Sequence, residues 1–234
     1  MSEKIQYPTI WLAGDSTCAN KREAERPQTG WGEMLPRLLL PGIRVSNHAK
    51  NGRSTKSFLA EGRIGPILRD IQPGDWLFVQ FGHNDEKLDD PSRGTDPSPG
   101  GLFEENLSVF ANEARKRGAL PVFLTPVQRR SFDSNGHINL THAAWEQAMR
   151  RFGDSYKEIV LDVSTASALL FEKAGPDESL KLFMHLKKGE SENYPNGDAD
   201  NTHFCERGAL EVAKLVVQLV KQEQRLKALQ KYLV

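Results

Sequence analysis

The sequence predicts an α/β protein in which helices cover both faces of a parallel sheet. Short runs rich in β-branched and aromatic residues alternate with longer amphipathic stretches, as βα units require. The run Trp76–Phe81 is apolar at nearly every position, which is typical of a central strand buried on both faces. Right-handed crossovers between such units build a three-layer, doubly wound sandwich. Because the composition does not shift along the 234 residues, we expect a single domain over residues 1–234.

Five segments are candidate strands. Each is short and is followed by polar or turn-forming residues. In chain order they are Ile10–Ala13, Arg44–Asn47, Trp76–Phe81, Pro121–Thr125 and Ile159–Val163. The carboxyl ends of parallel strands share one edge of the sheet, where α/β proteins bind their ligands.

Four segments carry apolar residues at helical spacing and are candidate helices. They are Leu107–Arg117, Thr141–Phe152, Ser164–Ala174 and Ala209–Tyr232. The stretch from Leu210 to Val234 sets leucines among Lys, Gln and Arg, which predicts a long amphipathic helix. Its apolar end is a candidate surface for a homodimer through the C-terminal helix.

Two polar segments interrupt this alternation and are predicted loops. Glu86–Gly101 is crowded with Asp, Pro, Gly and Ser, and Lys187–Asn201 is rich in Gly, Asn and charge. The first loop follows the run Trp76–Phe81 and therefore leaves the carboxyl edge of the sheet. Loops of this length are often functional, although a mobile surface insertion is the alternative.

The charge balance excludes some classes of partner. Lys and Arg together number 31, as do Asp and Glu, so no overall field attracts nucleic acid or an anionic membrane surface. The start Met1–Lys4 and the short apolar piece Ile10–Ala13 lack the pattern of a signal peptide. With two cysteines and no export signal, the expected compartment is the cytoplasm.

A serine, a histidine and an aspartate are the candidate catalytic residues. Ser16 lies in a Gly-Asp-Ser-Thr motif at the end of the first predicted strand. Asp200 and His203 are three residues apart, so the carboxylate can turn back onto the imidazole and orient it as a base for a serine. The alternatives are that Ser16 caps a helix, Asp200 forms an Asx-turn and His203 is solvated.

Two further motifs can supply hydrogen bonds to a developing oxyanion. Asn84, in Gly-His-Asn-Asp after the central strand, offers a side-chain amide, and Gly52, in Asn-Gly-Arg-Ser, offers a backbone N–H that no side chain shields. Asn and Gly are also ordinary turn residues, which is the alternative. All these motifs follow predicted strands or lie in the last loop, so they converge on one edge.

These motifs resemble the four blocks of the SGNH (GDSL-like) hydrolases, in order and over nearly the whole chain. The variants Gly-Asp-Ser-Thr, Gly-Arg-Ser and Phe-Gly-His-Asn-Asp, with Thr125-Pro-Val and Asp200-Asn-Thr-His-Phe, are similar to rhamnogalacturonan acetylesterases. The resemblance implies a flavodoxin-like sheet of five parallel strands and an esterase that removes acetyl groups from a pectin-type carbohydrate. It implies Ser16 as nucleophile, His203 as base, Asp200 as its orienter, and an oxyanion hole formed by Ser16, Gly52 and Asn84. The missing signal peptide favours acetylated oligosaccharides as the substrate over an extracellular polymer.

Substrate contacts are harder to predict. Galacturonate carries a carboxylate that arginine binds bidentately, so Arg53, Arg129 and Arg130 are candidates, with solvated surface charges as the alternative. Tyr194 can stack on a sugar ring or pack under its own loop. His83, beside Asn84, is a further candidate.

The sequence predicts no metal and no other cofactor, because it lacks two histidines at helical spacing. Cys18 and Cys205 each follow a catalytic candidate by two residues and either modulate activity by oxidation or act as inert small hydrophobes. Two other functions remain open: a lipid-directed esterase or thioesterase, and a sugar-binding protein without turnover. The polar loops favour a sugar substrate over a lipid.

Overall fold

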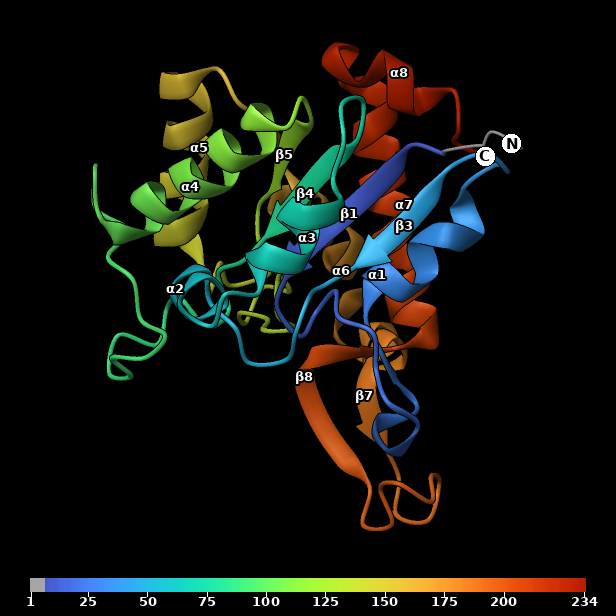
Figure 1. Cartoon of the computed structure of the whole chain (residues 1–234). Coiled ribbons are helices and arrows are strands. Elements are labelled where there is room, and N and C mark those ends of the chain that lie inside the picture. Colours follow the sequence, from blue (N-terminus) through green and yellow to red (C-terminus); the bar gives the residue numbers. More distant parts are fainter. Residues whose placement is uncertain (1–6) are drawn as a thin grey trace.

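Five parallel strands form the central sheet of the protein, which a computed structural model describes over residues 7–234. In chain order they are β1 (Thr9–Gly14), β3 (Arg44–Asn47), β4 (Trp76–Gln80), β5 (Leu120–Leu124) and β6 (Ile159–Leu161). Their order in the sheet is β3-β1-β4-β5-β6, and every neighbouring pair is parallel (Figure 1). This is the flavodoxin-like order, whose switch point lies between β1 and β4. The predicted doubly wound fold is confirmed; Met1–Lys4 lies outside the described residues.

The sheet is buried on both faces, as the composition of its central strand predicts. Along β4, Trp76 and Phe78 belong to one apolar core, whereas Leu77 and Val79 belong to the other. All four side chains are nearly inaccessible to solvent. Alternate residues of a strand point to opposite faces, so a run without polar residues needs a core on each side.

Eight helices flank the sheet, four on each face, in the part of the chain that the structure describes (Figure 1). One face is covered by α1 (Trp31–Met34), α6 (Val163–Ser179), α7 (Glu206–Gln222) and α8 (Lys227–Gln230). The other is covered by α2 (Thr55–Ala60), α3 (Ile64–Asp70), α4 (Leu102–Lys116) and α5 (Ala143–Tyr156). No helix in residues 7–234 is long and apolar enough to span a membrane.

The predicted helices exist, but several ends differ. α4 begins five residues before the predicted start at Leu107, and the segment from Glu86 to Gly101 is irregular, as predicted. In α6 the predicted end at Ala174 coincides with a kink, because Gly175 has a φ of 76° and Pro176 follows it. The short helices α2 and α3 were not predicted.

The C-terminal helix is shorter than predicted. α7 ends at Gln222 and the chain turns at Glu223, whose side chain accepts a hydrogen bond from the N–H of Arg225, before a 3-10 turn and α8. The turn lets Leu226 and Leu229 enter the core. The homodimer through this end of the chain stays a prediction.

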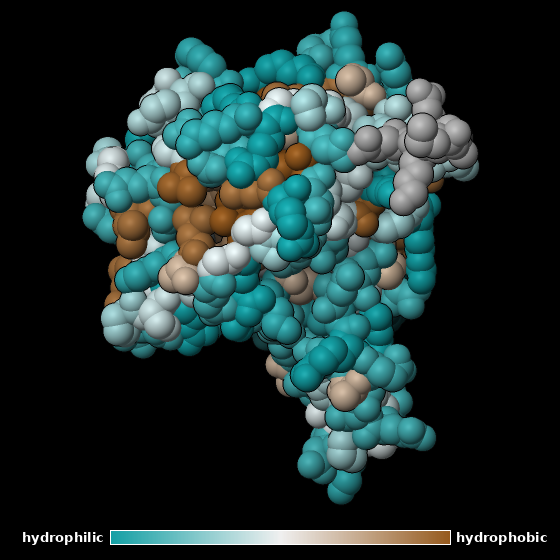
Figure 2. Space-filling view, viewed as in Figure 1, coloured by the Kyte–Doolittle hydropathy of each residue, from teal (hydrophilic) through white to brown (hydrophobic). Residues whose placement is uncertain are grey.

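A second, antiparallel sheet was not predicted. It contains β2 (Gln28–Thr29), β8 (Asp198–Cys205) and β7 (Phe183–Leu186), in that order. The prediction of a loop over Lys187–Asn201 is therefore wrong at its carboxyl end, where the chain already belongs to β8. The β7–β8 hairpin projects from the body of the molecule as an arm, and the surface of this arm is mainly hydrophilic (Figures 1 and 2).

Candidate active site

Ser16 lies in a tight turn directly after β1, at the carboxyl edge of the sheet. The side chain of Asp15 fixes this turn, because its Oδ1 accepts the backbone N–H of Thr17 at 2.9 Å and the Thr17 hydroxyl at 2.8 Å. The predicted position of Ser16 at the end of the first strand is thus observed. No helix begins at this serine, so the capping alternative does not apply.

The glycine before this turn is required by its neighbours. A Cβ on Gly14 would lie 2.5 Å from the sulfur of Cys18 and 2.7 Å from the carbonyl oxygen of Gln80. Both distances are shorter than a Cβ atom can approach another non-bonded atom. The close approach of β1 and β4 at this point brings the serine turn next to the loop that follows β4.

A bulge in β8 positions the histidine. Phe183 of β7 pairs with Phe204 of β8, but the next residue, Met184, pairs with Asp200, so Asn201–His203 have no partners on β7. In a regular strand, residues three apart point to opposite faces. The extra residues bend the strand and turn the side chains of Asp200 and His203 toward each other, as β-bulges next to active sites do.

Ser16, His203 and Asp200 form one line of hydrogen bonds. The Oγ of Ser16 lies 2.8 Å from Nε2 of His203, and Nδ1 of His203 lies 2.6 Å from Oδ2 of Asp200. The Oδ1 of Asp200 accepts the backbone N–H of Thr202 at 2.6 Å and that of His203 at 3.1 Å. This arrangement satisfies the carboxylate and leaves Nε2 to accept the proton of the serine hydroxyl.

The aspartate is ionised at neutral pH. Partial burial alone would raise the pKa of Asp200. The ring and charge of His203 and the two backbone N–H groups outweigh burial and lower this pKa to about 2. The negative charge is therefore present whenever the imidazole accepts a proton.

The oxyanion-hole candidates line the same pocket as the serine and the histidine. This pocket has a volume of about 360 Å³ and is lined by Ser16, Gly52, Asn84 and His203 among others. The side-chain amide of Asn84 donates one hydrogen bond to the carbonyl oxygen of Arg53 at 3.0 Å. An amide NH₂ has two hydrogens, so the second is available to a ligand. Gly52 has a φ of 76°, a conformation that favours glycine.

Asp85 connects the loops that carry these two donors. Its Oδ1 accepts hydrogen bonds from the backbone N–H and hydroxyl of Thr55, at 3.0 and 2.5 Å, and from the hydroxyl of Thr95 at 3.1 Å. Burial raises the pKa of this carboxyl to about 7, although the threonine donors oppose the rise. The neighbour of Asn84 thereby fixes the start of α2, just after Gly52.

Lys21 is a site residue that the sequence analysis missed. Its ammonium group is mostly buried and donates to the carbonyl oxygen of Ser16 at 2.6 Å and to Oδ1 of Asn51 at 2.7 Å. Burial lowers the pKa of this lysine, while the charge of Glu25 opposes the decrease. Lys21 thus joins the serine turn to the loop of Gly52. Lysine is rarely buried, and nothing in the local sequence distinguishes this one from a solvated charge.

Two of the predicted substrate residues reach the catalytic pocket. Arg129 lines it, held by Oε1 of Glu86 at 2.5 Å and the hydroxyl of Thr202 at 3.2 Å. His83 also lines it and donates from Nε2 to the carbonyl oxygen of Val127 at 2.9 Å. Burial, and then the neighbouring imidazole of His142, lower the pKa of His83 well below its usual value, so this ring is neutral.

Two others do not reach it. Arg130 lines neither of the pockets beside Ser16, and its guanidinium donates to the hydroxyl of Ser179 and to Oδ1 of Asn201, both at 3.1 Å. It braces β8 against the end of α6, and its role as a substrate contact stays a prediction. Tyr194 is partly exposed and donates its hydroxyl to the carbonyl oxygen of Glu25, in another segment of the chain, at 3.2 Å. Tyr194 is not among the described residues that line the catalytic pocket.

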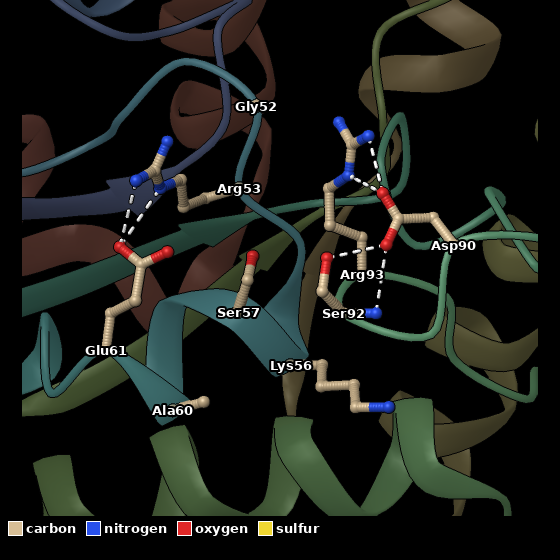
Figure 3. Close-up of a pocket in the computed structure, with 9 residues that line it drawn as sticks. All are labelled: Gly52, Arg53, Lys56, Ser57, Ala60, Glu61, Asp90, Ser92 and Arg93. Atoms are coloured by element: carbon tan, nitrogen blue, oxygen red, sulfur yellow. Dashed lines mark hydrogen bonds and ion pairs between the residues drawn. The ribbon is translucent and has the colours of Figure 1, made fainter.

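The irregular segment after β4 supplies side chains to the site. Lys87 and Arg93 line the catalytic pocket, and Arg93 also lines the larger pocket beside it together with Arg53 (Figure 3). The length and position of this segment predicted a functional loop, but the sequence analysis named none of its residues. A loop without helical or strand periodicity gives no register from which to choose them.

The two cysteines are free, and their surroundings differ. Cys18 is buried, and burial raises the pKa of its thiol far above the usual value, which disfavours the reactive thiolate. Cys205 is partly exposed and donates to the carbonyl oxygen of Lys181. The surroundings of Cys18 thus support the inert alternative for that residue. In residues 7–234, no group of three or more His, Cys, Asp or Glu side chains is arranged to hold a metal ion.

Comparison with known proteins identifies the family. Residues 12–209 match the sequence profile of the GDSL-like Lipase/Acylhydrolase family. The chain belongs to this family. The expectation drawn from its four motifs is therefore confirmed, and with the hydrogen-bonded serine, histidine and aspartate described above, the protein is a carboxylic ester hydrolase.

Several relatives cover most of the chain. The rhamnogalacturonan acetylesterase RhgT of Bacillus subtilis is 45% identical over 95% of this chain and 92% of its own. The rhamnogalacturonan acetylesterase of Emericella nidulans is 26% identical over 91% of this chain and 84% of its own. The crystal structure of YxiM from Bacillus subtilis superposes with a TM-score of 0.79 at 27% identity, covering 93% of this chain and 57% of that protein. Axe2, an acetylxylan esterase from Geobacillus stearothermophilus, shares the fold with a TM-score of 0.65 at 15% identity, over 91% of this chain and 93% of its own.

Proposed function

We propose that the protein is an acetylesterase that removes O-acetyl groups from rhamnogalacturonan oligosaccharides and so takes part in pectin degradation. The observation that carries the chemistry is the line of hydrogen bonds from Ser16 through His203 to Asp200 at the wall of one pocket. The substrate is inferred from the similarity to RhgT, which extends over 95% of the chain.

The arrangement supports a two-step acyl transfer. The Oγ of Ser16 attacks the acetyl carbonyl carbon while Nε2 of His203 takes the hydroxyl proton. The carbonyl oxygen becomes an oxyanion that the N–H groups of Ser16 and Gly52 and the amide of Asn84 can stabilise. The bond to the sugar oxygen then breaks, and His203 gives its proton to that oxygen. Water, deprotonated by the same imidazole, then attacks the carbonyl carbon of the acetyl-serine. The bond from that carbon to Oγ breaks, acetate leaves, and His203 returns the proton to Oγ.

A lipid esterase is the main competing function. An enzyme for long acyl chains needs an apolar channel next to its serine. Most residues that line the catalytic pocket are instead polar or charged, including His83, Asn84 and Arg129. These side chains suit the hydroxyl and carboxylate groups of a sugar and leave a long hydrocarbon chain without apolar contacts.

Hydrolysis of four esters tests the proposal, measured as acetate released from the sugars and as p-nitrophenol released from the two aryl esters. They are acetylated rhamnogalacturonan oligosaccharides, acetylated xylo-oligosaccharides, p-nitrophenyl acetate and p-nitrophenyl decanoate. We expect the highest kcat/KM for the first and the lowest for the last. Ser16→Ala should abolish hydrolysis of all four, whereas Ser108→Ala, on the outside of α4, should change none. A higher kcat/KM for the decanoate than for the acetylated sugars would move the assignment to a lipid esterase.

A further inference from the structure

A second pocket adjoins the catalytic pocket on the side of the oxyanion hole. It has a volume of about 530 Å³, compared with about 360 Å³ for the catalytic pocket. Both are lined by Gly52 and Arg93, so they lie next to each other, and together they are called the cleft below. Its floor is α2 and its far wall is the loop after β4 (Figure 3). A ligand whose acetyl group reaches Ser16 can therefore extend past Gly52 into this second pocket.

The cleft is positively charged although the chain as a whole has no net charge. Arg53, Lys56 and Arg93 line the second pocket together with two acids, Glu61 and Asp90. Lys56 is held by a backbone carbonyl oxygen and not by a carboxylate. The catalytic pocket adds further cations, and none of the described residues that line it is Asp or Glu. A local excess of positive charge favours an anionic ligand.

Two guanidinium groups are held ready for such a ligand. Nε and Nη2 of Arg53 bind Oε2 of Glu61 at 3.1 and 3.0 Å, and Nε and Nη2 of Arg93 bind Oδ2 of Asp90, both at 2.6 Å. In Figure 3, Glu61 lies below the guanidinium of Arg53 and Asp90 lies beside that of Arg93, and the remaining nitrogen of each guanidinium points away from its carboxylate. Ion pairs that fix a guanidinium in advance reduce the entropy cost of binding.

Hydrogen-bonding capacity remains on both arginines. Arginine has five N–H donors, and three of those on Arg53 are engaged, by Glu61 and by the carbonyl oxygen of Asn51. On Arg93, Asp90 takes two, and Nη1 makes only a long contact of 3.5 Å with Oδ1 of Asn84. Planar guanidinium groups pair most strongly with carboxylates, in a forked geometry.

We infer that this second pocket binds the carboxylate of a uronic acid residue of the acetylated oligosaccharide, through Arg53 and Arg93. The inference rests on the proposed function and adds to it the site that selects acidic oligosaccharides. Nη1 of Arg53 binds the carbonyl oxygen of Asn51, in the same peptide group as the N–H of Gly52, at 2.9 Å. The carbonyl oxygen of Arg53 accepts from Asn84. The carboxylate subsite is thus built onto the oxyanion hole, so that the bound uronate sets the position of the ester.

A comparison of two substrates and two proteins tests whether Arg93 binds the uronate carboxylate. The substrates are an acetylated rhamnogalacturonan oligosaccharide and the same oligosaccharide with its carboxylates methyl-esterified. The proteins are the wild type and Arg93→Gln. With the acidic substrate, Arg93→Gln should raise KM by about 10- to 100-fold, the usual loss for a charged hydrogen bond. With the methyl ester, KM of the wild type should already be raised and the substitution should add little, because the partner charge is gone.

A structural effect of the substitution would look different. If Arg93→Gln merely disturbed the loop, KM would rise equally for both substrates, and the inference would be overturned. Arg37→Gln, which breaks an exposed ion pair with Glu206, is the matched control and should leave the KM ratio of the two substrates unchanged. Equal KM values of the wild type for the acidic and esterified substrates would also refute the subsite.

Failure of the proposed function would be recognised separately. In that case the wild type would hydrolyse p-nitrophenyl acetate but release no acetate from either oligosaccharide. A wild type that deacetylates both forms with equal KM values retains the proposed function but lacks the uronate subsite.

Discussion

Asp200 holds His203 at two points: its Oδ1 accepts the backbone N–H of His203 at 3.1 Å, and its Oδ2 accepts the ring Nδ1–H at 2.6 Å. The first contact stabilises the bulge of β8, and the second sets the tautomer of the ring. Because different oxygen atoms make the two contacts, a substitution can separate the structural role of this carboxylate from its catalytic role.

Asp200→Asn should lower kcat by about 10³- to 10⁴-fold while the protein stays folded. The Oδ1 of the asparagine can still accept the backbone N–H groups of Thr202 and His203. Its NH₂ replaces Oδ2 and can only donate, so the imidazole proton moves to Nε2 and the ring no longer accepts from Ser16. Kinetics with p-nitrophenyl acetate and thermal unfolding measure the two effects. A loss of less than 10-fold would contradict the role of Asp200 as the orienter.

Asn84→Ala should lower kcat by about 100- to 1000-fold with a smaller change in KM, because the amide is needed when charge develops on the carbonyl oxygen. Asn84→Asp keeps the shape but replaces the donor with a negative charge, so its loss should be at least as large. The variants can be compared on p-nitrophenyl acetate, which needs no sugar contacts. If Asn84→Asp kept the wild-type kcat, the amide would not belong to the oxyanion hole.

Lys21→Met should reduce both stability and turnover. It leaves the carbonyl oxygen of Ser16 and Oδ1 of Asn51 without their donor, at a cost of about 1 to 3 kcal/mol for a buried unsatisfied group. The serine turn and the loop of Gly52 would no longer be joined, so we expect kcat to fall by about 10- to 100-fold. Lys116→Met, which removes an exposed ion pair on α4, is the control. A purely structural Lys21 would lower the unfolding temperature and leave kcat of the folded enzyme unchanged.

Much of the fold was predictable because its central strands carry their own pattern. An apolar run such as Trp76–Phe81 can only be buried on both faces, and parallel strands bring the residues after β1 and β4 to one edge. Consequently Ser16, Gly52 and Asn84 were expected to share a pocket, which they line together with His203. The proximity followed from topology and required no knowledge of side-chain contacts.

The parts that were not predicted depend on tertiary contacts. β8 is rich in polar residues, and its bulge is visible only in its pairing with β7. The six-residue helix α2 is too short for a helical period to be read from it. Arg130 and Arg129 are adjacent in the sequence, yet only Arg129 lines the catalytic pocket. The turn at Glu223 contains neither glycine nor proline, the residues that usually mark the end of a helix in a sequence.

The stability of the protein should depend on pH through Asp85. Burial raises the pKa of this carboxyl from 3.8 to about 7 in the folded protein. Between these values the folded chain keeps a proton that the unfolded chain has released. The contribution of Asp85 is therefore most favourable below pH 4 and is lost as the pH rises toward 7, by up to about 1.4 kcal/mol per pH unit.

Asp85→Asn removes this dependence because the amide carries no charge, and its Oδ1 can still accept from Thr55 and Thr95. Urea unfolding of both proteins at several pH values between 4 and 7.5 gives the difference in unfolding free energy, in which the titration of all other groups largely cancels. We expect the variant to gain stability relative to the wild type as the pH rises. Asp89→Asn, exposed nearby on the same loop, should show no such trend. A constant difference, or one that changes in the wild type's favour, would mean that the pKa of Asp85 is not raised in the folded protein.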